Sequence, residues 1–458
     1  MAVGAAEDVV RSTDLVTTKA NMTLLSLAGF RAVRITSIWA PGQTAPTGVE
    51  TKVLRNVAAA ASLSGIRVYV SVYHAGSRTT PLTDDDRADF SAYAASLAQS
   101  FPSFRDFIVG NEPNLNRFWL PQFAADGTDA AAPAYLALLA SSYDALKGVS
   151  PFVKVYGGAL APRGVDRPGT GRDTHSPTSF IRDLGAAYRA SGRTVPVMDA
   201  LAFHPYADNS SQSPDFAHPL STTIGIADYG KLVSLLAEAF DGTAQPGSTL
   251  PLLYDEFGVE SIVPEAKAPL YTGAEPVTTK PVDEAKQAAY YAKALSLTFC
   301  QPNVVGVLFF HSQDEPALAS WQSGVYYADG SPKTSLPAVR AALAATRGGS
   351  IAKCSGLAID VKPSILAFNS KPFGIRLQCD VDCVYRARLV KLPRGSTTLA
   401  TSGRLAAGSF KRVTFPKRAL AGGSYKLTIS LVQPVNPGAP LLRESKPFTI
   451  AAPVASTR

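Results

Sequence analysis

Residues 1–345 repeat one pattern of hydrophobic and polar positions. A short run of apolar or β-branched residues is followed by a polar loop and then by an Ala/Leu-rich stretch with helical spacing. Eight such units in one segment predict a (β/α)8 barrel (TIM barrel) with inserted loops. The eight apolar runs are Ala2–Gly4, Ala32–Ile38, Arg67–Val72, Phe107–Gly110, Lys154–Gly158, Ala200–His204, Leu252–Tyr254 and Val304–Phe310.

Helices are expected between these runs, and Thr83 is a candidate N-cap for one of them. An open doubly wound sheet is the alternative fold, but no Gly-rich phosphate-binding turn follows the first run. The segment Gly169-Thr170-Gly171-Arg172 lacks the Lys-Ser/Thr of a phosphate loop, and we interpret it as a surface loop. The expected helices include Lys52–Ser64, Asp84–Ser100, Ala134–Gly148, Pro177–Ser191, Tyr229–Phe240 and Val282–Phe299.

The composition changes after the barrel segment. Arg347-Gly348-Gly349-Ser350 is typical of a linker, and short alternating runs separated by Pro and Gly follow it. We expect a linker at 346–355 and an immunoglobulin-like β-sandwich accessory domain at 356–458. Its expected strands are Gly356–Val361, Phe373–Gln378, Val384–Lys391, Ser409–Thr414, Tyr425–Val432 and Phe448–Ala451.

Charge is unevenly distributed between the two segments. Residues 346–458 contain 18 Lys and Arg against 4 Asp and Glu, whereas residues 1–345 contain 26 against 32. The basic segment could bind anionic cell-surface glycans weakly, or nucleic acid. Many basic residues alternate with apolar ones, as in Tyr385-Arg386-Ala387-Arg388-Leu389, which favours a solvated sheet face, so we expect no nucleic-acid partner.

The four cysteines all lie in the second half of the chain. Their even number suits two disulfides, with Cys379–Cys383 as one pair and Cys300–Cys354 as the other; four free thiols are the alternative. Disulfides would indicate a secreted protein, and a cytoplasmic protein is the alternative. The start of the chain does not have the profile of a signal peptide, and no apolar run is long enough to span a membrane.

Polar and aromatic residues gather where the predicted strands end, which is where a barrel carries its active site. Two tips carry a Glu: Ile108-Val109-Gly110-Asn111-Glu112-Pro113 on the fourth run, and Leu252-Leu253-Tyr254-Asp255-Glu256-Phe257-Gly258 on the seventh. The fourth and seventh strands face each other across the mouth of a barrel. Other candidates for substrate binding near these tips are Arg34, Trp39, His74, Trp119, His204, Tyr206, Phe310, His311 and Trp321.

Two facing carboxylates are the groups needed to cleave a glycosidic bond. In the retaining mechanism one carboxylate attacks the anomeric carbon, while the other donates a proton to the leaving oxygen and later activates water. Alone, Asn111-Glu112-Pro113 could be the N-terminal turn of a helix. We expect Asp255 to point to the opposite face of its strand from Glu256.

These motifs resemble glycoside hydrolase clan A, the retaining barrel glycosidases that include families 5 and 39. The resemblance rests on Asn-Glu-Pro after the fourth strand, His204-Pro205-Tyr206 after the sixth and a Glu on the seventh, and it covers about residues 1–345. It implies that Glu112 is the acid/base, that Glu256 is the nucleophile, and that Asn111 donates to the sugar 2-hydroxyl. It also implies that Arg34 and Tyr206 keep Glu256 ionised, with His74 and His204 in the same subsite.

One position departs from the clan pattern. Members commonly carry a Trp at the tip of the eighth strand, where this chain has Phe309-Phe310-His311, so Phe310, His311 or Trp321 would take its place. We expect a retaining glycoside hydrolase that acts on a carbohydrate without a cofactor, and the five scattered His do not indicate a metal site. The alternatives are a non-catalytic carbohydrate-binding barrel and a transglycosylase that uses the same site.

Overall fold

The computed structural model describes residues 1–352, 354, 362–363, 374–378, 382–393, 395–406, 410–415, 420–432, 441–444 and 447–450. The chain divides into two compact units. One comprises Met1–Ala227 with Leu232–Lys353, and the other comprises Asp228–Lys231 with Cys354–Arg458. The linker at 346–355 stays a prediction.

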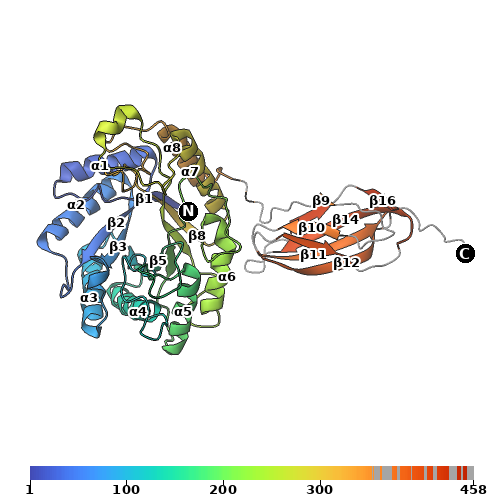
Figure 1. The fold of residues 1–458 in the computed structure, drawn as a ribbon, viewed down its shortest axis with the longest axis horizontal. Helices are drawn as coiled ribbons and strands as arrows, with labels where there is room; N and C mark the ends of the chain where they lie inside the picture. The colour runs from blue at the N-terminus through green and yellow to red at the C-terminus, as the bar shows by residue number, and fades with distance from the viewer. Residues whose placement is uncertain are drawn as a thin grey trace, which may run out of the picture. The chain divides into compact units, whose positions relative to one another are not determined.

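The first unit is a closed barrel of eight parallel strands surrounded by helices, so the predicted (β/α)8 fold is confirmed and the open doubly wound sheet is wrong (Figure 1). Closure is made by β1, which pairs with both β2 and β8. The strands are β1 (Ala2–Ala6), β2 (Ala32–Trp39), β3 (Arg67–His74), β4 (Asp106–Val109), β5 (Lys154–Leu160), β6 (Ala200–Phe203), β7 (Leu252–Phe257) and β8 (Val304–Phe310).

The helices that cover the barrel begin where the chain supplies caps. Thr83 accepts a hydrogen bond from the Asp86 amide, as predicted, and Asp14 and Asp283 cap two other helices in the same way. The helices are α1 (Leu15–Ala28), α2 (Gly48–Ser64), α3 (Asp84–Ser100), α4 (Ala131–Val149), α5 (Pro177–Ala190), α6 (Tyr229–Phe240), α7 (Glu284–Phe299) and α8 (Leu336–Arg347), with short 3-10 turns at Ser77–Thr79, Ile226–Asp228 and Glu265–Leu270.

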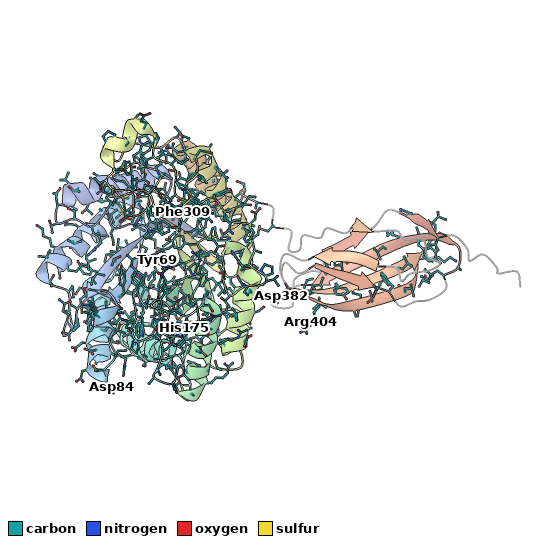
Figure 2. All side chains as sticks on the ribbon, viewed as in Figure 1. Tyr69, Asp84, His175, Phe309, Asp382 and Arg404 are labelled. Carbon is teal, nitrogen blue, oxygen red and sulfur yellow. The ribbon has the colours of Figure 1, made fainter. Side chains whose placement is uncertain are left out.

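Large side chains fill the interior of the barrel. Tyr69, which is labelled in Figure 2, meets Tyr156 edge to face, with ring centroids 5.7 Å apart. Ile108, Leu253 and Leu308 are buried in the same cluster. Such a packed layer closes the bottom of the barrel, so a substrate can enter only from the opposite end.

The second unit is made of antiparallel strands, as expected for a β-sandwich. One sheet has the order β13-β10-β9, and the other has the order β12-β11-β14-β15, with β16 paired to β14. Predicted strands are present as β10 (Gly374–Gln378), β11 (Cys383–Lys391), β13 (Phe410–Thr414), β14 (Gly423–Val432) and β16 (Phe448–Ile450). The sequence prediction missed β9 (Lys362–Pro363), β12 (Ser396–Leu405) and β15 (Leu441–Glu444). The predicted strand Gly356–Val361 lies outside the described residues.

Cys300, Cys354 and Cys383 are disulfide-bonded, and the Cys300–Cys354 pair is the predicted one. None of the described cysteines is a free thiol, so that alternative is wrong for them. Cys379, the predicted partner of Cys383, lies outside the described residues.

No helix in the described part of the chain is long and apolar enough to cross a membrane.

Candidate active site

A cavity of about 890 Å³ opens where the barrel strands end. Glu112 and Glu256, the two predicted catalytic residues, both line it. Six of the residues predicted to bind substrate line it as well, namely Arg34, Asn111, Tyr206, Phe310, His311 and Trp321. The structure therefore brings most of the predicted site together in one place.

Glu112 is carried into the cavity by a tightly bent backbone. Gly110 has a φ of +84°, which favours glycine, and a Cβ there would lie 3.0 Å from the Tyr135 ring. Glu112 itself has a φ of +43°, and its amide donates to the Ala159 carbonyl at 2.9 Å. Neighbouring strands thus hold this turn in a conformation that is uncommon for a non-glycine residue.

A β-bulge places Asp255 and Glu256 on the same side of β7. Tyr254 is opposite Val307 and Phe257 is opposite Phe309, so three steps along β7 match two along β8. Glu256 faces the cavity, while the Asp255 carboxylate contacts His204 and Arg34 just beneath it. The expectation that Asp255 points to the opposite face is therefore wrong, because the extra residue interrupts the alternation of a regular strand.

Glu256 accepts hydrogen bonds at both carboxylate oxygens. Arg34 Nη1 donates to Oε1, and the Tyr206 hydroxyl donates to Oε2 at 2.9 Å. Burial would lower the pKa of Arg34, but the Glu256 and Asp255 carboxylates raise it above its ordinary value. Burial, together with Glu256, raises the pKa of Tyr206 well above its usual range. Both donors therefore keep their protons.

Arg34 also connects the two halves of the site. Its Nη2 donates to Asn111 Oδ1 at 2.8 Å and lies 3.2 Å from Ser71 Oγ. With Oδ1 occupied, the Asn111 amide group is left with its N–H donors for a ligand.

His204 is fully buried between three carboxylates. Its Nδ1 lies 2.9 Å from Glu112 Oε1, and its Nε2 lies 3.3 Å from Asp255 Oδ2. Burial would lower the pKa of His204, but Glu256 and Asp255 raise it to about 10. The ring is therefore an imidazolium at neutral pH, and both nitrogens donate.

The two glutamates are close enough to act on one bond. One carboxylate oxygen from each lies within 4.8 Å of the other and of a His204 nitrogen. Retaining glycosidases hold their two carboxyl groups about 5 Å apart, and inverting ones hold them further apart to admit a water. The same three side chains are spaced like metal ligands, but the imidazolium and Arg34 oppose the binding of a cation there.

Aromatic rings form one wall of the cavity. The Tyr206 and Trp321 rings are tilted at 34°, with centroids 4.9 Å apart, and Phe310 meets Trp321 edge to face at 5.3 Å. His311 is fixed by a contact between its Nδ1 and the Ala6 carbonyl at 2.9 Å. Trp321, which comes from the loop after β8, thus brings an indole ring to the wall beside the atypical tip of that strand.

Four of the residues predicted to bind substrate do not line the cavity: Trp39, His74, Trp119 and His204. Trp39 and Trp119 are fully buried and do not line the cavity. The Trp39 indole packs against Phe90 of α3, and the His74 ring packs against Trp119 instead of facing the cavity. In β3 it is Tyr73, the neighbour of His74, that lines the cavity, because alternate residues of a strand face opposite sides.

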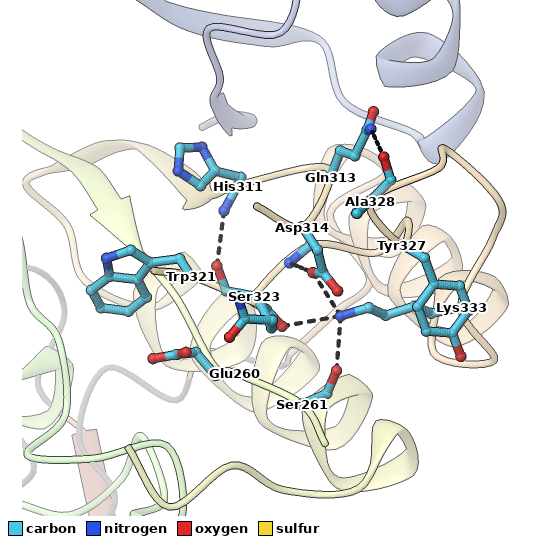
Figure 3. Close-up of polar contacts among 12 residues, drawn as sticks. Glu260, Ser261, His311, Gln313, Asp314, Trp321, Ser323, Tyr327, Ala328 and Lys333 are labelled. Carbon is cyan, nitrogen blue, oxygen red and sulfur yellow. Dashed lines mark hydrogen bonds and ion pairs between the residues drawn. The ribbon is translucent and has the colours of Figure 1, made fainter. Parts of the chain in front are cut away.

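The sequence prediction also missed Glu260, which lines the cavity four residues after Glu256. Figure 3 shows it below Trp321, near a buried network in which Lys333 Nζ donates to Ser261 Oγ and Asp314 Oδ1, each at 2.8 Å. Glu260 is only 7% exposed, and its Oε2 has no partner among the described residues. Burial and the nearby Glu275 raise its pKa to about 8. No sequence motif marked this position.

Comparisons with known proteins bear on the fold. No family model matches the sequence, and no curated protein matches it. Among solved structures, GH5_18 from Streptomyces cattleya in complex with Manb1-4GlcNAc is 17% identical, with a TM-score of 0.52 over 76% of this chain and 81% of that one. Its complex with GlcNAc gives a TM-score of 0.50, at 17% identity, over 76% and 80%.

A calcium-binding mutant of Bacteroides uniformis beta-glucuronidase 2 covers 98% of this chain, at 11% identity and a TM-score of 0.47, but the match spans only 45% of that longer chain. At these identities the likeness concerns the fold. The chain is similar to GH5 structures in its barrel, which agrees with the fold of clan A glycosidases.

Proposed function

We propose that this protein is a retaining glycoside hydrolase, with Glu256 as nucleophile and Glu112 as acid/base. The observation that carries the proposal is the pair of facing carboxylates, with oxygens within 4.8 Å, at the base of a cavity with an aromatic wall. The names of the structures that share the barrel, such as GH5_18, point to the same chemistry.

In the first step the Glu112 carboxylic acid gives its proton to the glycosidic oxygen. The bond from that oxygen to the anomeric carbon breaks, and Glu256 forms an ester with the carbon. In the second step Glu112, now a carboxylate, takes a proton from water, whose oxygen attacks the anomeric carbon and releases Glu256. Arg34 and Tyr206 bind the carboxylate form of Glu256, which is both the attacking and the leaving group.

The balance of charged groups in the site is consistent with this two-step mechanism. Three carboxylates, Glu112, Glu256 and Asp255, meet two cations, Arg34 and the His204 imidazolium. One added proton balances the charges, and the acid/base must carry one proton when substrate binds. A transglycosylase would use the same site with a sugar in place of water. A non-catalytic carbohydrate-binding barrel would not need this pair of carboxylates.

The test is hydrolysis of a panel of aryl β-glycosides by the wild type, Glu256→Ala and Glu112→Ala. We expect both variants to lose at least about a thousandfold in kcat, because each removes a group that forms or breaks bonds. Azide should rescue Glu256→Ala with inverted configuration and Glu112→Ala with retained configuration, since azide replaces the nucleophile in one and the activated water in the other.

Glu265→Ala, which removes an exposed carboxylate, is the control and should keep full activity. Undiminished hydrolysis by Glu256→Ala would refute the nucleophile assignment. A wild type that binds sugars but hydrolyses none of the panel would favour the binding protein, and sugar-linked products would favour the transglycosylase.

We also propose that the protein is secreted, because the disulfide between Cys300 and Cys354 persists in an oxidising compartment.

A further inference from the structure

Charge is divided between two halves of the cavity. Glu7, Asp8, Glu260 and Glu315 come from the loops after β1, β7 and β8. Arg117, on the opposite half, follows β4. Arg163 and Arg172 follow β5. Because β4 and β5 lie across the barrel from β1 and β8, the cavity has an acidic side and a basic side.

The basic side holds two arginines without acidic partners. Arg163 has a carboxylate partner, with its Nε 3.6 Å from Asp208. Within residues 1–352, neither Arg117 nor Arg172 has a side-chain hydrogen bond or ion pair; the Arg117 guanidinium lies only over the Phe118 ring, at 5.4 Å. The carboxylate of the adjacent Asp173 is occupied, since it accepts from the Thr170 amide and hydroxyl.

The loops that carry these two arginines are hydrogen-bonded to each other. Leu115 forms an antiparallel bridge with Thr174, and the His175 amide donates to the Asn114 carbonyl at 2.9 Å. Arg117 follows this junction by two residues and Arg172 precedes it by two, and both line the same cavity. Two unpaired positive charges in one cavity repel each other, and a bound anion would reduce that repulsion.

The basic side is also the side of the acid/base. Arg117 follows Glu112 by five residues in one loop, and Glu112 protonates the leaving group, so the leaving group lies toward this half of the cavity. The sugar that is attacked lies toward Glu256, whose half carries the additional carboxylates. An anionic sugar such as a uronic acid would be repelled there.

We propose that Arg117 and Arg172 form a subsite for an oxyanion on the leaving-group part of the substrate. The substrate is then an uncharged or amino sugar joined to a group that carries a carboxylate or sulfate. Guanidinium groups suit this role because they bind such oxyanions in a bidentate way. The inference rests on the proposed function, since the site of bond cleavage defines which part of the substrate leaves.

The experiment uses matched leaving groups. We compare β-glycosides of 4-methylumbelliferone with those of 7-hydroxycoumarin-4-acetic acid and 7-hydroxycoumarin-4-methanesulfonic acid, which differ in one anionic group remote from the reacting oxygen. For the wild type at low salt we expect KM to be at least about tenfold lower with an anionic leaving group. Comparison of the carboxylate substrate with the sulfonate substrate shows which oxyanion is preferred.

In Arg117→Gln/Arg172→Gln this preference should disappear, while kcat/KM for the uncharged glycoside stays within about twofold of the wild type. Arg167→Gln is the matched control, because Arg167 is exposed on the same loop but does not line the cavity. It should keep the preference. The preference should also shrink as salt is raised, because these arginines are exposed.

A wild type without the preference, or a double variant that retains it, would overturn the proposal. Binding of the free coumarin acids can be measured directly from their fluorescence. This measurement distinguishes failure of the oxyanion subsite from failure of the proposed hydrolase function. If no glycoside is hydrolysed but the acids bind the wild type and not the double variant, only the hydrolase assignment fails. If glycosides are hydrolysed but the acids bind both proteins equally, only the oxyanion subsite fails.

Discussion

Glu260 shows how one buried carboxyl couples the site to pH. Its pKa of about 8 lies above the ordinary glutamate value, so the folded protein holds a proton there that the unfolded chain has already lost. Between the unfolded pKa and about pH 8, the folded state binds more protons than the unfolded state. The free energy of unfolding therefore falls as pH rises through this window, by at most about 1.4 kcal/mol per pH unit from this group.

We expect Glu260→Gln to weaken this loss of stability. The amide is uncharged at every pH, so the variant should be more stable than the wild type by about 1–3 kcal/mol at pH 9 and close to it at pH 5. Urea denaturation at several pH values measures the difference. Equal pH dependence in the two proteins would show that Glu260 ionises at its ordinary pKa when folded.

Among the elements of the barrel, β5 shows most directly how a strand depends on glycine. Gly158 has a φ of +92°, and a Cβ there would lie 2.7 Å from Leu201 Cδ1 and 2.9 Å from the Ala202 carbonyl oxygen. The Gly158 amide donates a hydrogen bond to the Tyr135 hydroxyl at 2.6 Å. This glycine therefore lets β5 and β6 approach each other closely below Glu112.

We expect Gly158→Ala to destabilise the protein by about 2–4 kcal/mol, because it adds backbone strain and a steric clash. Gly148→Ala is the control: Gly148 lies in α4 with nothing within 4 Å of an added Cβ, so this change should be neutral or stabilise by up to about 1 kcal/mol. Urea denaturation of both variants tests the contrast. Equal stability of the two variants would contradict it.

The elements of the barrel were largely predictable because each strand and helix repeats a regular hydrophobic pattern. The tips of β4 and β7 were predictable for the same reason, since a Glu after an apolar run stands out. The bulge that turns Asp255 inward was not predictable, because alternation along a strand gives no sign of an extra residue. Nor was the burial of Trp39 and Trp119, since an indole packs equally well in a core or against a sugar.

In the second unit, the missed strand β12 has a polar sequence that lacks a clear alternation, whereas β11 and β14 alternate regularly. Edge strands of this kind carry less of the hydrophobic core, which makes their pattern weaker.

At the scale of the whole molecule, residues 346–458 are strongly basic whereas residues 1–345 are not, and this difference predicts binding to anionic polymers. Arg386 and Arg388 of β11 are exposed, while the residues between and beside them are buried, so the sheet presents basic side chains on one face. We expect the full chain to bind an anionic polysaccharide at low salt and to lose about tenfold in affinity between 50 and 200 mM salt.

Arg386→Gln/Arg388→Gln should weaken this binding severalfold, and Arg55→Gln, which removes an exposed charge on α2, should not. A pull-down at several salt concentrations measures both. Absence of binding at low salt would leave the basic face as a solvated sheet surface.

The closure of the barrel by β1 and β8 has a consequence for synthesis of the chain. Ala6 pairs with Phe310, and the Glu7 carboxylate accepts from the Ser312 amide at 2.9 Å, so the wall beside His311 joins segments about 300 residues apart. A ribosome must make nearly the whole barrel before its first strand gains its second neighbour. Until then the edges of β1 and of the growing sheet are exposed to other chains, and folding is slowed by the late long-range contacts. The cavity is thus among the last features of the molecule to form, and any chain released early would lack it entirely.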